Sequence, residues 1–537
     1  MAGAEVDVVV IGGGATGAGV LRDLVMRGLT ATLLERGDFA SGTSGRYHGL
    51  LHSGARYVES DPISAHHCIE ENAVLRRIAP GTIEPTDGYF VATPDDPDDY
   101  LDRFPAACAA AGIDAEPVAL DELFRAEPLL NRDIRAAYRV PDAALEPWEL
   151  VDATLASARA HGATAHRYRA VIGFEKGAGG EITAVRTHDT RSGEDATIAC
   201  RAVVSASGAW AGRVAELAGA RLTMSPGKGS MLIFNRRFTS AVVNRLAPPG
   251  DGDILVPVHT VCILGTTDIT GEDPDDAVVT DAEVNALLAD GERLVPGISE
   301  ARILRAYAGS RPLYDADEMS GEPTHDESRE ISRAHHVIDH GRRDGVGGLW
   351  SIVGGKLTTY RLMARDAVDA VAVELGNDAP CRTADEPLPE PAGHSPYWLG
   401  DRLAAVEAEG GGDADLVCEC ELVSRARLEV ALDRRADSSL DDLRRTTRLG
   451  MGPCQGAFCM PRAAAMLDAR RADGRLDPRT PDANVALRTF AAERLRGTRP
   501  IAWGDQLSEV FLTAGVFRGT LGADSLPEST GGDDAAG

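Results

Sequence analysis

Residues 6–17 have the sequence VDVVVIGGGATG, in which an apolar run leads directly into three glycines and a fourth glycine follows three residues later. The apolar run at 6–11 is typical of a buried parallel strand, and the glycines after it indicate a tight turn. Residues 14–28 favour a helix, and residues 30–35 (TATLLE) favour a second strand. This order predicts a β-α-β unit of the kind that binds dinucleotides.

The glycines at 12, 14 and 17 have the spacing Gly-x-Gly-x-x-Gly at the start of the predicted helix. Gly12 permits the turn, Gly14 lets a pyrophosphate approach the backbone, and Gly17 allows the helix to pack closely on the strand. Unpaired N–H groups at the helix start would bind the phosphates, and Glu35 would accept hydrogen bonds from ribose hydroxyls. The alternative is a structural Gly-rich turn, but the flanking strand and the acidic residue favour nucleotide binding.

Two further Gly-rich segments end predicted strands far along the chain, at 206–208 (ASG) and 354–356 (GGK). The carboxyl ends of the strands of an open α/β sheet meet at one ligand crevice. A single cofactor that touches all of these segments must be long and extended. This requirement favours FAD over NAD.

The chain of 537 residues has a formal net charge of -28, from 55 basic and 83 acidic residues. This balance argues against nucleic acid as a partner, because phosphate backbones attract an excess of Lys and Arg. The only lysines are Lys176, Lys228 and Lys356. An acidic, lysine-poor composition predicts a protein from a very salty cytoplasm, with codon bias as the alternative explanation.

No apolar run reaches the roughly 20 residues that a membrane-spanning helix needs. The first ten residues, MAGAEVDVVV, lack the basic region and the long apolar stretch of a signal peptide. We therefore expect a cytoplasmic protein, or one bound peripherally on the cytoplasmic side of the membrane through indirect contact. The length allows two to four domains.

Four cysteines near the C-terminus form two close pairs, Cys418-x-Cys420 and Cys454-x-x-x-x-Cys459. Such pairs supply four thiolates to one centre, either a 2Fe-2S cluster or zinc. The one-residue spacing of the first pair is unusual for zinc, and a redox cluster has a use beside a flavin that zinc lacks. The region also resembles the small bacterioferritin-associated-ferredoxin-like (BFD-like) domain, which carries a 2Fe-2S cluster, so zinc and a purely structural role are the weaker alternatives.

Several motifs resemble those of FAD-dependent glycerol-3-phosphate dehydrogenases: ASGTSGRYHGLLHSGARY at 40–57, GTTD at 265–268, GSRPL at 309–313 and VGGKLTTYR at 353–361. With the cysteine region added, the chain resembles the anaerobic branch of this family over most of residues 5–510. The resemblance implies oxidation of glycerol 3-phosphate to dihydroxyacetone phosphate. It also implies partner subunits B and C, through which electrons from the cluster reach a membrane quinone.

A phosphorylated substrate needs several fixed cations, and arginine forks suit a phosphate well. The resemblance implies that the substrate lies among Arg56, Tyr57, Arg311, Arg333 and Lys356. His52 is the predicted general base by its location, and the alternative is a histidine that holds the flavin loop through backbone bonds. Aerobic relatives have a histidine where this chain has Met231, which cannot take a proton, so the base assignment stays open.

The predicted contacts to FAD come from the glycine fingerprint and from the motifs above. They are Gly12, Gly14, Ala15, Thr16, Gly17, Glu35, Arg36, Thr43, Ser44, Arg46, Gly49, Leu50, Val171, Ala206, Gly208, Trp210, Gly354, Gly355, Lys356, Leu357 and Thr358.

We expect an α/β fold with a FAD-binding Rossmann-like domain of the D-amino-acid-oxidase and glutathione-reductase type, an inserted mixed-sheet substrate domain and a small C-terminal iron-sulfur domain with four cysteine ligands. The oxidoreductase would span residues 1–382, with its FAD part at 1–80, 150–225 and 335–382 and its substrate part at 81–149 and 226–334. After it would come a linker at 383–412, the BFD-like domain at 413–470, a helical extension at 471–523 and a disordered tail at 524–537.

Two rival functions are compatible with the same fold. A flavoprotein that oxidises an amine or a 2-hydroxy acid would not need the phosphate-binding cations. A non-catalytic electron-carrier protein would keep the flavin fold without substrate chemistry.

Overall fold

The computed structural model describes residues 5–271, 273–314, 333–390, 399–410, 415–478, 480–520, 522 and 525–527. Within these residues, no helix combines the length and the apolar character needed to cross a bilayer.

The predicted β-α-β unit is confirmed as β1 (Glu5–Ile11), α1 (Ala15–Met26) and β2 (Ala31–Leu34). Successive side chains of a strand point to opposite faces of the sheet. Val8 and Val10 of β1 accordingly pack into the core on one face, and Val9 and Ile11 pack into the core on the other. Both faces of β1 are therefore covered, as expected for a central parallel strand.

The first sheet contains eight strands within the described residues, six of them in the order β10-β11-β12-β1-β2-β9, with β20 pairing β12 and β19 pairing β20. The pairs β9–β2, β2–β1, β1–β12 and β12–β20 are parallel. Its further strands are β9 (Thr164–His166), β10 (Arg169–Lys176), β11 (Ile182–Asp189), β12 (Asp195–Ser205), β19 (His335–Asp339) and β20 (Leu349–Gly354).

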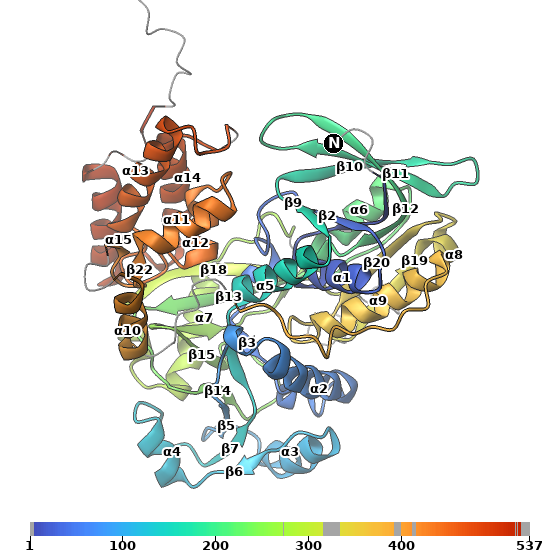
Figure 1. Ribbon diagram of the computed structural model, residues 1–537. Helices are drawn as coiled ribbons and strands as arrows, with labels where there is room; N and C mark the ends of the chain where they lie inside the picture. Colours follow the sequence, from blue (N-terminus) through green and yellow to red (C-terminus); the bar gives the residue numbers. More distant parts are fainter. Residues whose placement is uncertain are drawn as a thin grey trace, which may run out of the picture.

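Helices cover both faces of this sheet (Figure 1). On one face α1 packs against α5 and α9, and on the other α6 lies against β10 and β20. Helices were predicted at 62–78, 149–161 and 357–375, and each is present. The helices of this part are α2 (Pro62–Ile78), α5 (Pro147–Ala160), α6 (Ala211–Leu217), α8 (His340–Asp344) and α9 (Tyr360–Leu375).

The second sheet contains nine strands in the described part of the chain, with eight in the order β17-β13-β16-β15-β14-β5-β7-β6 and β18 pairing β13. All of its strands fall within 81–149 and 226–334, the segments that we assigned to the substrate part. Its elements are β5 (Gly88–Ala92), β6 (Glu116–Pro117), β7 (Ala136–Val140), β13 (Gly227–Phe234), β14 (Val242–Arg245), β15 (Ile254–Val258), β16 (Val261–Gly265), β17 (Ile269–Thr270), β18 (Ile303–Arg311), α3 (Asp98–Ala110), α4 (Leu120–Ala126) and α7 (Asp281–Leu294).

A small sheet lies where the chain passes between the two large ones. It consists of β3 (Leu50–Leu51), β8 (Ala143–Leu145) and β4 (Ile83–Glu84), with β8 in the middle. Both outer pairs are antiparallel. The loop that carries the motif at 40–57 is therefore held by hydrogen bonds to the segment that enters α5.

The C-terminal helices form a third unit, drawn in orange and red in Figure 1. The first part of the predicted linker is not a free connection, because Leu388 is buried in the core of the first sheet and its N–H donates to the carbonyl of Ile78. The linker range also contains a helix, α10, which its Pro-rich and acidic flanks obscured. The elements are α10 (Leu399–Gly410), β21 (Leu416–Cys418), β22 (Val423–Ser424), α11 (Arg425–Arg434), α12 (Leu440–Thr447), α13 (Cys459–Ala472), α14 (Ala483–Arg496) and α15 (Gln506–Ala514).

The predicted helical extension is not a separate body. Phe490 of α14 packs into the same core as Cys418 and Leu443 of the cysteine region. Residues 525–527 of the predicted disordered tail also lie against α14, where the carbonyl of Leu526 accepts a hydrogen bond from Arg488. Residue 524 and residues 528–537 lie outside the described residues.

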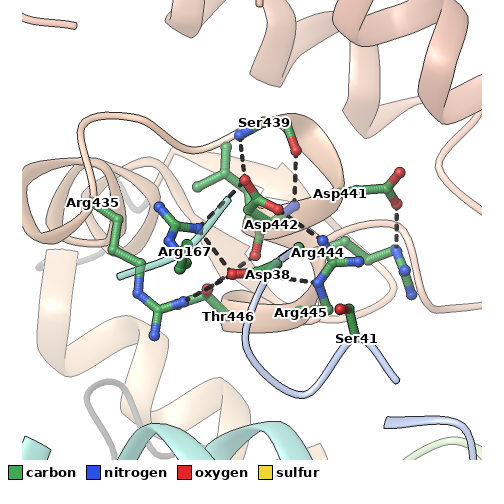
Figure 2. Close-up of polar contacts among 12 residues, drawn as sticks. Asp38, Ser41, Arg167, Arg435, Ser439, Asp441, Asp442, Arg444, Arg445 and Thr446 are labelled. Atoms are coloured by element: carbon green, nitrogen blue, oxygen red, sulfur yellow. Dashed lines mark hydrogen bonds and ion pairs between the residues drawn. The ribbon is translucent and has the colours of Figure 1, made fainter. Parts of the chain in front are cut away.

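A buried network of ion pairs joins the cysteine region to the FAD part (Figure 2). Asp38, in the loop after β2, accepts hydrogen bonds from Arg167 at 2.9 Å and from Arg445 of α12 at 2.7 Å. Asp442 accepts from Arg445 at 2.7 Å and from the hydroxyl of Tyr168 at 2.6 Å. Asp38 and Asp442 are 2% and 0% exposed, so this contact excludes water.

Candidate active site and cluster site

One large cavity, about 780 Å³ in volume, lies between the two large sheets. It runs from the N-terminus of α1, along the loop at 40–60, to the turn between β20 and α9. Ligand pockets of about 300–1,000 Å³ hold drug-sized or larger ligands. The position at the carboxyl ends of β1 and β20 is where an open α/β sheet binds its cofactor.

The phosphate end of this cavity is formed by the glycine turn. Gly12 has a φ of +108°, a conformation that other residues rarely adopt. A Cβ atom at Gly17 would lie 1.9 Å from the carbonyl oxygen of Gly12, so only glycine allows α1 to come this close to β1. Helix α1 has no side-chain cap on its own N-terminal residue, which leaves backbone donors for a pyrophosphate.

Glu35 holds the loop that would surround the ribose. Its two carboxylate oxygens accept hydrogen bonds from the N–H groups of Gly13 at 2.6 Å and Gly37 at 2.7 Å. Burial raises the pKa of Glu35, and these backbone bonds act in the opposite direction. Each oxygen keeps a second lone pair, so the ribose contact predicted for Glu35 is sterically and chemically open.

The predicted cofactor residues converge on this cavity with two exceptions. Gly17 lies behind the wall because its role is helix packing. Gly49 lines a neighbouring cavity. The remaining residues line the flavin cavity: Gly12, Gly14, Ala15, Thr16, Glu35, Arg36, Thr43, Ser44, Arg46, Leu50, Val171, Ala206, Gly208, Trp210, Gly354, Gly355, Lys356, Leu357 and Thr358.

The predicted substrate residues line the other end of the same cavity. The ammonium of Lys356 lies 4.1 Å from the centroid of the Tyr57 ring, a cation–π distance. No carboxylate in the described part of the chain forms an ion pair with Lys356. Its charge therefore faces the cavity beside an aromatic ring.

The three arginines differ from Lys356 because aspartates hold them. Arg56 donates through one nitrogen to both oxygens of Asp253, at 2.6 and 2.8 Å, while its other terminal nitrogen, Nη1, is buried without a hydrogen bond. Arg311 donates to Asp268 at 2.9 Å, and Arg333 lies 3.7 Å from the second oxygen of Asp268. Motif reasoning identified the cations but missed Asp253 and assigned no role to Asp268, although Asp268 ends the motif GTTD.

His52 lies between these groups, in a position that serves both readings of its role. Its backbone N–H donates to Thr358 at 3.1 Å and its carbonyl accepts from Asn72 at 3.1 Å. Its ring makes no hydrogen bond within the described residues and contacts the rings of His48 and Tyr57 at centroid distances of 5.6 Å. Burial lowers the pKa of His52 well below its usual range, aided by His48 and Lys356, so the ring is neutral and able to accept a proton.

Sequence reasoning missed His48, which lines the same cavity four residues earlier. Burial, together with the charges of Arg56 and Arg311, lowers its pKa to about 3. Nδ1 of His48 accepts the N–H of Leu50 at 3.2 Å, which fixes the ring and leaves Nε2 as the protonated nitrogen. The spacing His-x-x-x-His in the motif at 40–57 was the available signal.

Met231, the residue that replaces a histidine of the aerobic relatives, is buried in β13. It pairs with Gly265 of β16 and does not line the flavin cavity. Lys228, three residues earlier, is 2% exposed and bound to Glu283 at 3.2 Å. This segment therefore supplies packing here, and no proton acceptor for the substrate.

The four cysteines come together at the surface of the C-terminal unit. Cys418 ends β21, Cys459 begins α13, and the other two lie in the loops between. The Sγ atoms of Cys420 and Cys454 are 3.5 Å apart. Cys418 and Cys454 each exchange hydrogen bonds with both Cys420 and Cys459, which closes a ring of four thiols.

This ring fits a cluster with four thiolate ligands. A Cβ atom at Gly452 would lie 2.7 Å from the Cβ of Cys420 and 3.0 Å from its sulfur, so the loop fits closely around the thiols only because this residue is glycine. Four converging sulfurs without a histidine suit an iron-sulfur cluster or zinc.

Comparisons with known proteins distinguish these alternatives. The model of the FAD dependent oxidoreductase family matches residues 7–361, and that of the BFD-like [2Fe-2S] binding domain matches residues 416–469. The A subunit of the anaerobic glycerol-3-phosphate dehydrogenase of Escherichia coli K12 is 43% identical over 96% of this chain and 97% of the relative. The A1 subunit of the anaerobic enzyme of Haloferax volcanii is 43% identical over 98% of this chain and 92% of the relative.

The chain belongs to the family of catalytic A subunits of anaerobic glycerol-3-phosphate dehydrogenases. Its cofactors are FAD and a 2Fe-2S cluster, as expected from the glycine fingerprint and the cysteine spacing. Among solved structures, the glycerol-3-phosphate dehydrogenase of Bacillus halodurans complexed with FAD aligns with a TM-score of 0.66 and 21% identity, over 94% of this chain and 97% of that one. This similarity confirms the predicted α/β fold class.

Proposed function

We propose that this protein oxidises sn-glycerol 3-phosphate to dihydroxyacetone phosphate. The observation that carries the proposal is the positive charge without an ion-pair partner at one end of the flavin cavity, on Lys356 and on Nη1 of Arg56. An amine or a 2-hydroxy acid does not require this charge. A phosphate dianion does, because it needs several donors and at least one uncompensated cation to leave water.

The arginines would position the phosphate while the aspartates position the arginines. Asp268 holds Arg311 and Arg333 at one place on the wall, and Asp253 fixes the plane of Arg56. Their guanidinium groups are thus oriented before the substrate arrives, which lowers the entropy lost on binding. Lys356 would add a point charge that adapts to the phosphate oxygens.

His52 would take the proton of the hydroxyl group on C2 of the substrate. Its neutral ring is a proton acceptor over the physiological range, and the anionic substrate would make it more basic in the complex. FAD, when bound, supplies the acceptor for the hydride that leaves C2. The hydroxyl proton and the C2 hydride together account for the two hydrogens lost in forming the ketone.

The four cysteines Cys418, Cys420, Cys454 and Cys459 would hold the 2Fe-2S cluster. A cluster of this kind, when bound, accepts electrons one at a time and so links a two-electron flavin to a one-electron partner. We propose that partner subunits B and C receive these electrons and deliver them to a membrane quinone, and that this chain lies peripherally on the cytoplasmic side. The acceptor subunits are inferred from the lettered names of the relatives, which imply an enzyme of several chains.

Replacement of Cys454 by Ser tests the ligand assignment. We expect loss of the cluster's EPR signal, because one thiolate ligand is gone, while substrate still bleaches the flavin. Cys262, buried in the second sheet, is the control, and Cys262→Ser should keep the EPR signal. An intact cluster signal in the Cys454 variant would remove this residue from the ligand set.

A substrate panel tests the reaction itself. The purified holoenzyme with a dye acceptor should oxidise sn-glycerol 3-phosphate far faster than glycerol, sarcosine or 2-hydroxyglutarate. The comparison with glycerol isolates the phosphate contribution, because the two differ only in that group. Faster turnover of sarcosine or 2-hydroxyglutarate would reject the proposal, and no turnover with any of them would favour an electron-carrier protein.

A further inference from the structure

A second cavity, about 410 Å³ in volume, lies between the flavin loop and the C-terminal unit. The loop at 40–49 and β18 form one side, and the cysteine region with α14 forms the other. Ser41, Arg46 and Tyr47 line both this cavity and the flavin cavity. The two spaces are therefore neighbours, but the glycine turn at the N-terminus of α1 faces only the first.

Arginines dominate the polar wall of this cavity. Two of them are neutralised, since Arg445 binds Asp38 and Asp442, and Arg448 binds Glu146 and Glu421. The other arginines on the wall are Arg46, Arg305, Arg444, Arg494 and Arg496.

Among the described residues, only two further carboxylates line the cavity, Asp441 and Glu493. Asp441 binds Arg444 at 3.0 Å, which Figure 2 shows at the edge of the ion-pair network. Glu493 lies 3.9 Å from Arg496. Five arginines against two carboxylates leave about three positive charges on this wall without a counter-ion.

Two of the guanidinium groups have donors without acceptors. Arg494 is 4% exposed, and its Nε and Nη2 are buried with no hydrogen bond, while Nη1 donates to Gln455 at 3.0 Å. Nε of Arg305 is likewise buried and unpaired. A buried donor on a charged group that lacks an acceptor is strongly unfavourable, so such atoms indicate a missing partner.

The arginines also repel one another. Burial, followed by the charges of Arg444 and Arg305, lowers the pKa of Arg494 well below its usual range. Burial and the charge of Arg444 lower the pKa of Arg305 to about 10. Both shifts show that the cluster of cations is unfavourable without an anion among them.

We propose that this cavity is a binding site for a phosphate group, held between the guanidinium forks of Arg305 and Arg494. Planar forks match phosphate oxygens in pairs, and a dianion would neutralise most of the excess charge. The rest of the wall includes apolar side chains, among them Val258, Ile263 and Val279. This composition favours a phosphate ester with an apolar group over inorganic phosphate.

The site lies one hydrogen bond from the cysteine loop. Arg494 donates to the side chain of Gln455, and Gln455 follows Cys454 directly and donates to the carbonyls of Met451 and Gly452. A bound phosphate would add negative charge beside the loop and make a cluster there harder to reduce. Occupancy of the site would thus bias electron transfer out of the flavin.

Thermal unfolding of the holoenzyme in phosphate-free buffer, with ionic strength held constant by KCl, tests the proposal. Inorganic phosphate and phenyl phosphate should each raise Tm in a saturable manner. Arg305→Gln and Arg494→Gln should each weaken the response roughly tenfold, since a hydrogen bond to a charged group contributes about 1.5 kcal/mol or more. Tighter binding of phenyl phosphate would assign the site to a phosphate ester, and equal binding would assign it to inorganic phosphate.

Two controls localise the effect. Arg125→Gln, at an exposed ion pair with Asp121, should respond like the wild type, and so should Lys356→Met, which alters only the substrate end of the flavin cavity. Without phosphate, Arg305→Gln and Arg494→Gln should match or exceed the wild-type Tm, because each removes a repelled charge. A response that is absent in the wild type, or that persists in both variants, would overturn the proposal.

Discussion

The substrate end of the flavin cavity and the contact between the cysteine region and the FAD part both concentrate buried charge, but they balance it differently. At the contact, both oxygens of Asp38 accept from arginines, and Asp442 is bound by Arg445 and Tyr168. In the cavity, Lys356 faces an aromatic ring and forms no ion pair with the described carboxylates. A closed network holds two parts of a protein together, whereas an open one is completed by a ligand.

Replacement of Lys356 by Met should have the largest effect. It should lower kcat/KM for glycerol 3-phosphate roughly a thousandfold, because a desolvated charge pair with the substrate contributes about 2–5 kcal/mol. Steady-state kinetics with a dye acceptor measures this change, and the flavin spectrum checks that FAD stays bound. Lys176→Met is the control, since Lys176 donates to the carbonyl of Ala218 outside the cavity and should tolerate the change. Equal kinetics in the two variants would remove Lys356 from the site.

Replacement of Asp38 by Asn should rank second. It leaves Arg167 and Arg445 without their shared carboxylate, and breaking such a buried pair costs about 3 kcal/mol in the free energy of unfolding. Urea unfolding followed by the visible absorbance of the cluster measures the loss. Asp99→Asn, at an exposed pair with Arg103, should change stability by less than about 0.5 kcal/mol. A loss as small as that control's would show that this contact does not hold the cysteine region in place.

The two regions should also respond to acid in different ranges of pH. The pKa of His48 is lowered to about 3, so between that value and about 6.5 the unfolded chain binds a proton that the folded chain does not. Stability from this group is complete above pH 6.5 and is lost as the pH falls. The charges of Arg445 and Arg167 lower the pKa of Asp38 despite its burial, so the contact should weaken only below about pH 4.

Urea unfolding at pH 7.0 and pH 5.5 checks this difference and is the smallest effect of the three. The wild type should lose about 1 kcal/mol more than the His48→Gln variant over this interval. Equal losses would mean that His48 is already protonated in the folded protein, in conflict with its burial in the cavity.

The sequence predicted the parts that depend on local patterns. The alternation in β1 and the spacing of Gly12, Gly14 and Gly17 are visible in a window of a dozen residues, and so is the cysteine spacing. The same windows also located the flavin loop and the turn at Lys356. These patterns reflect backbone geometry and ligand chemistry, which act over short distances along the chain.

The charge partners could not be predicted in this way. Asp38 and Arg445 are 407 residues apart in sequence, and Arg56 and Asp253 are 197 apart. Any of the many acidic residues could have paired with these arginines until the fold brought particular ones together. The helix α10 was missed for a different reason, because the prolines around it dominated the composition of the segment.

Anaerobic addition of sn-glycerol 3-phosphate to the purified holoenzyme tests the central claim most directly. The flavin absorbance should bleach in the wild type and in Cys454→Ser, and it should persist in Lys356→Met at the same substrate concentration. A flavin that stays oxidised in the wild type, or that bleaches equally well with glycerol, would contradict the assignment of this cavity to a phosphorylated substrate.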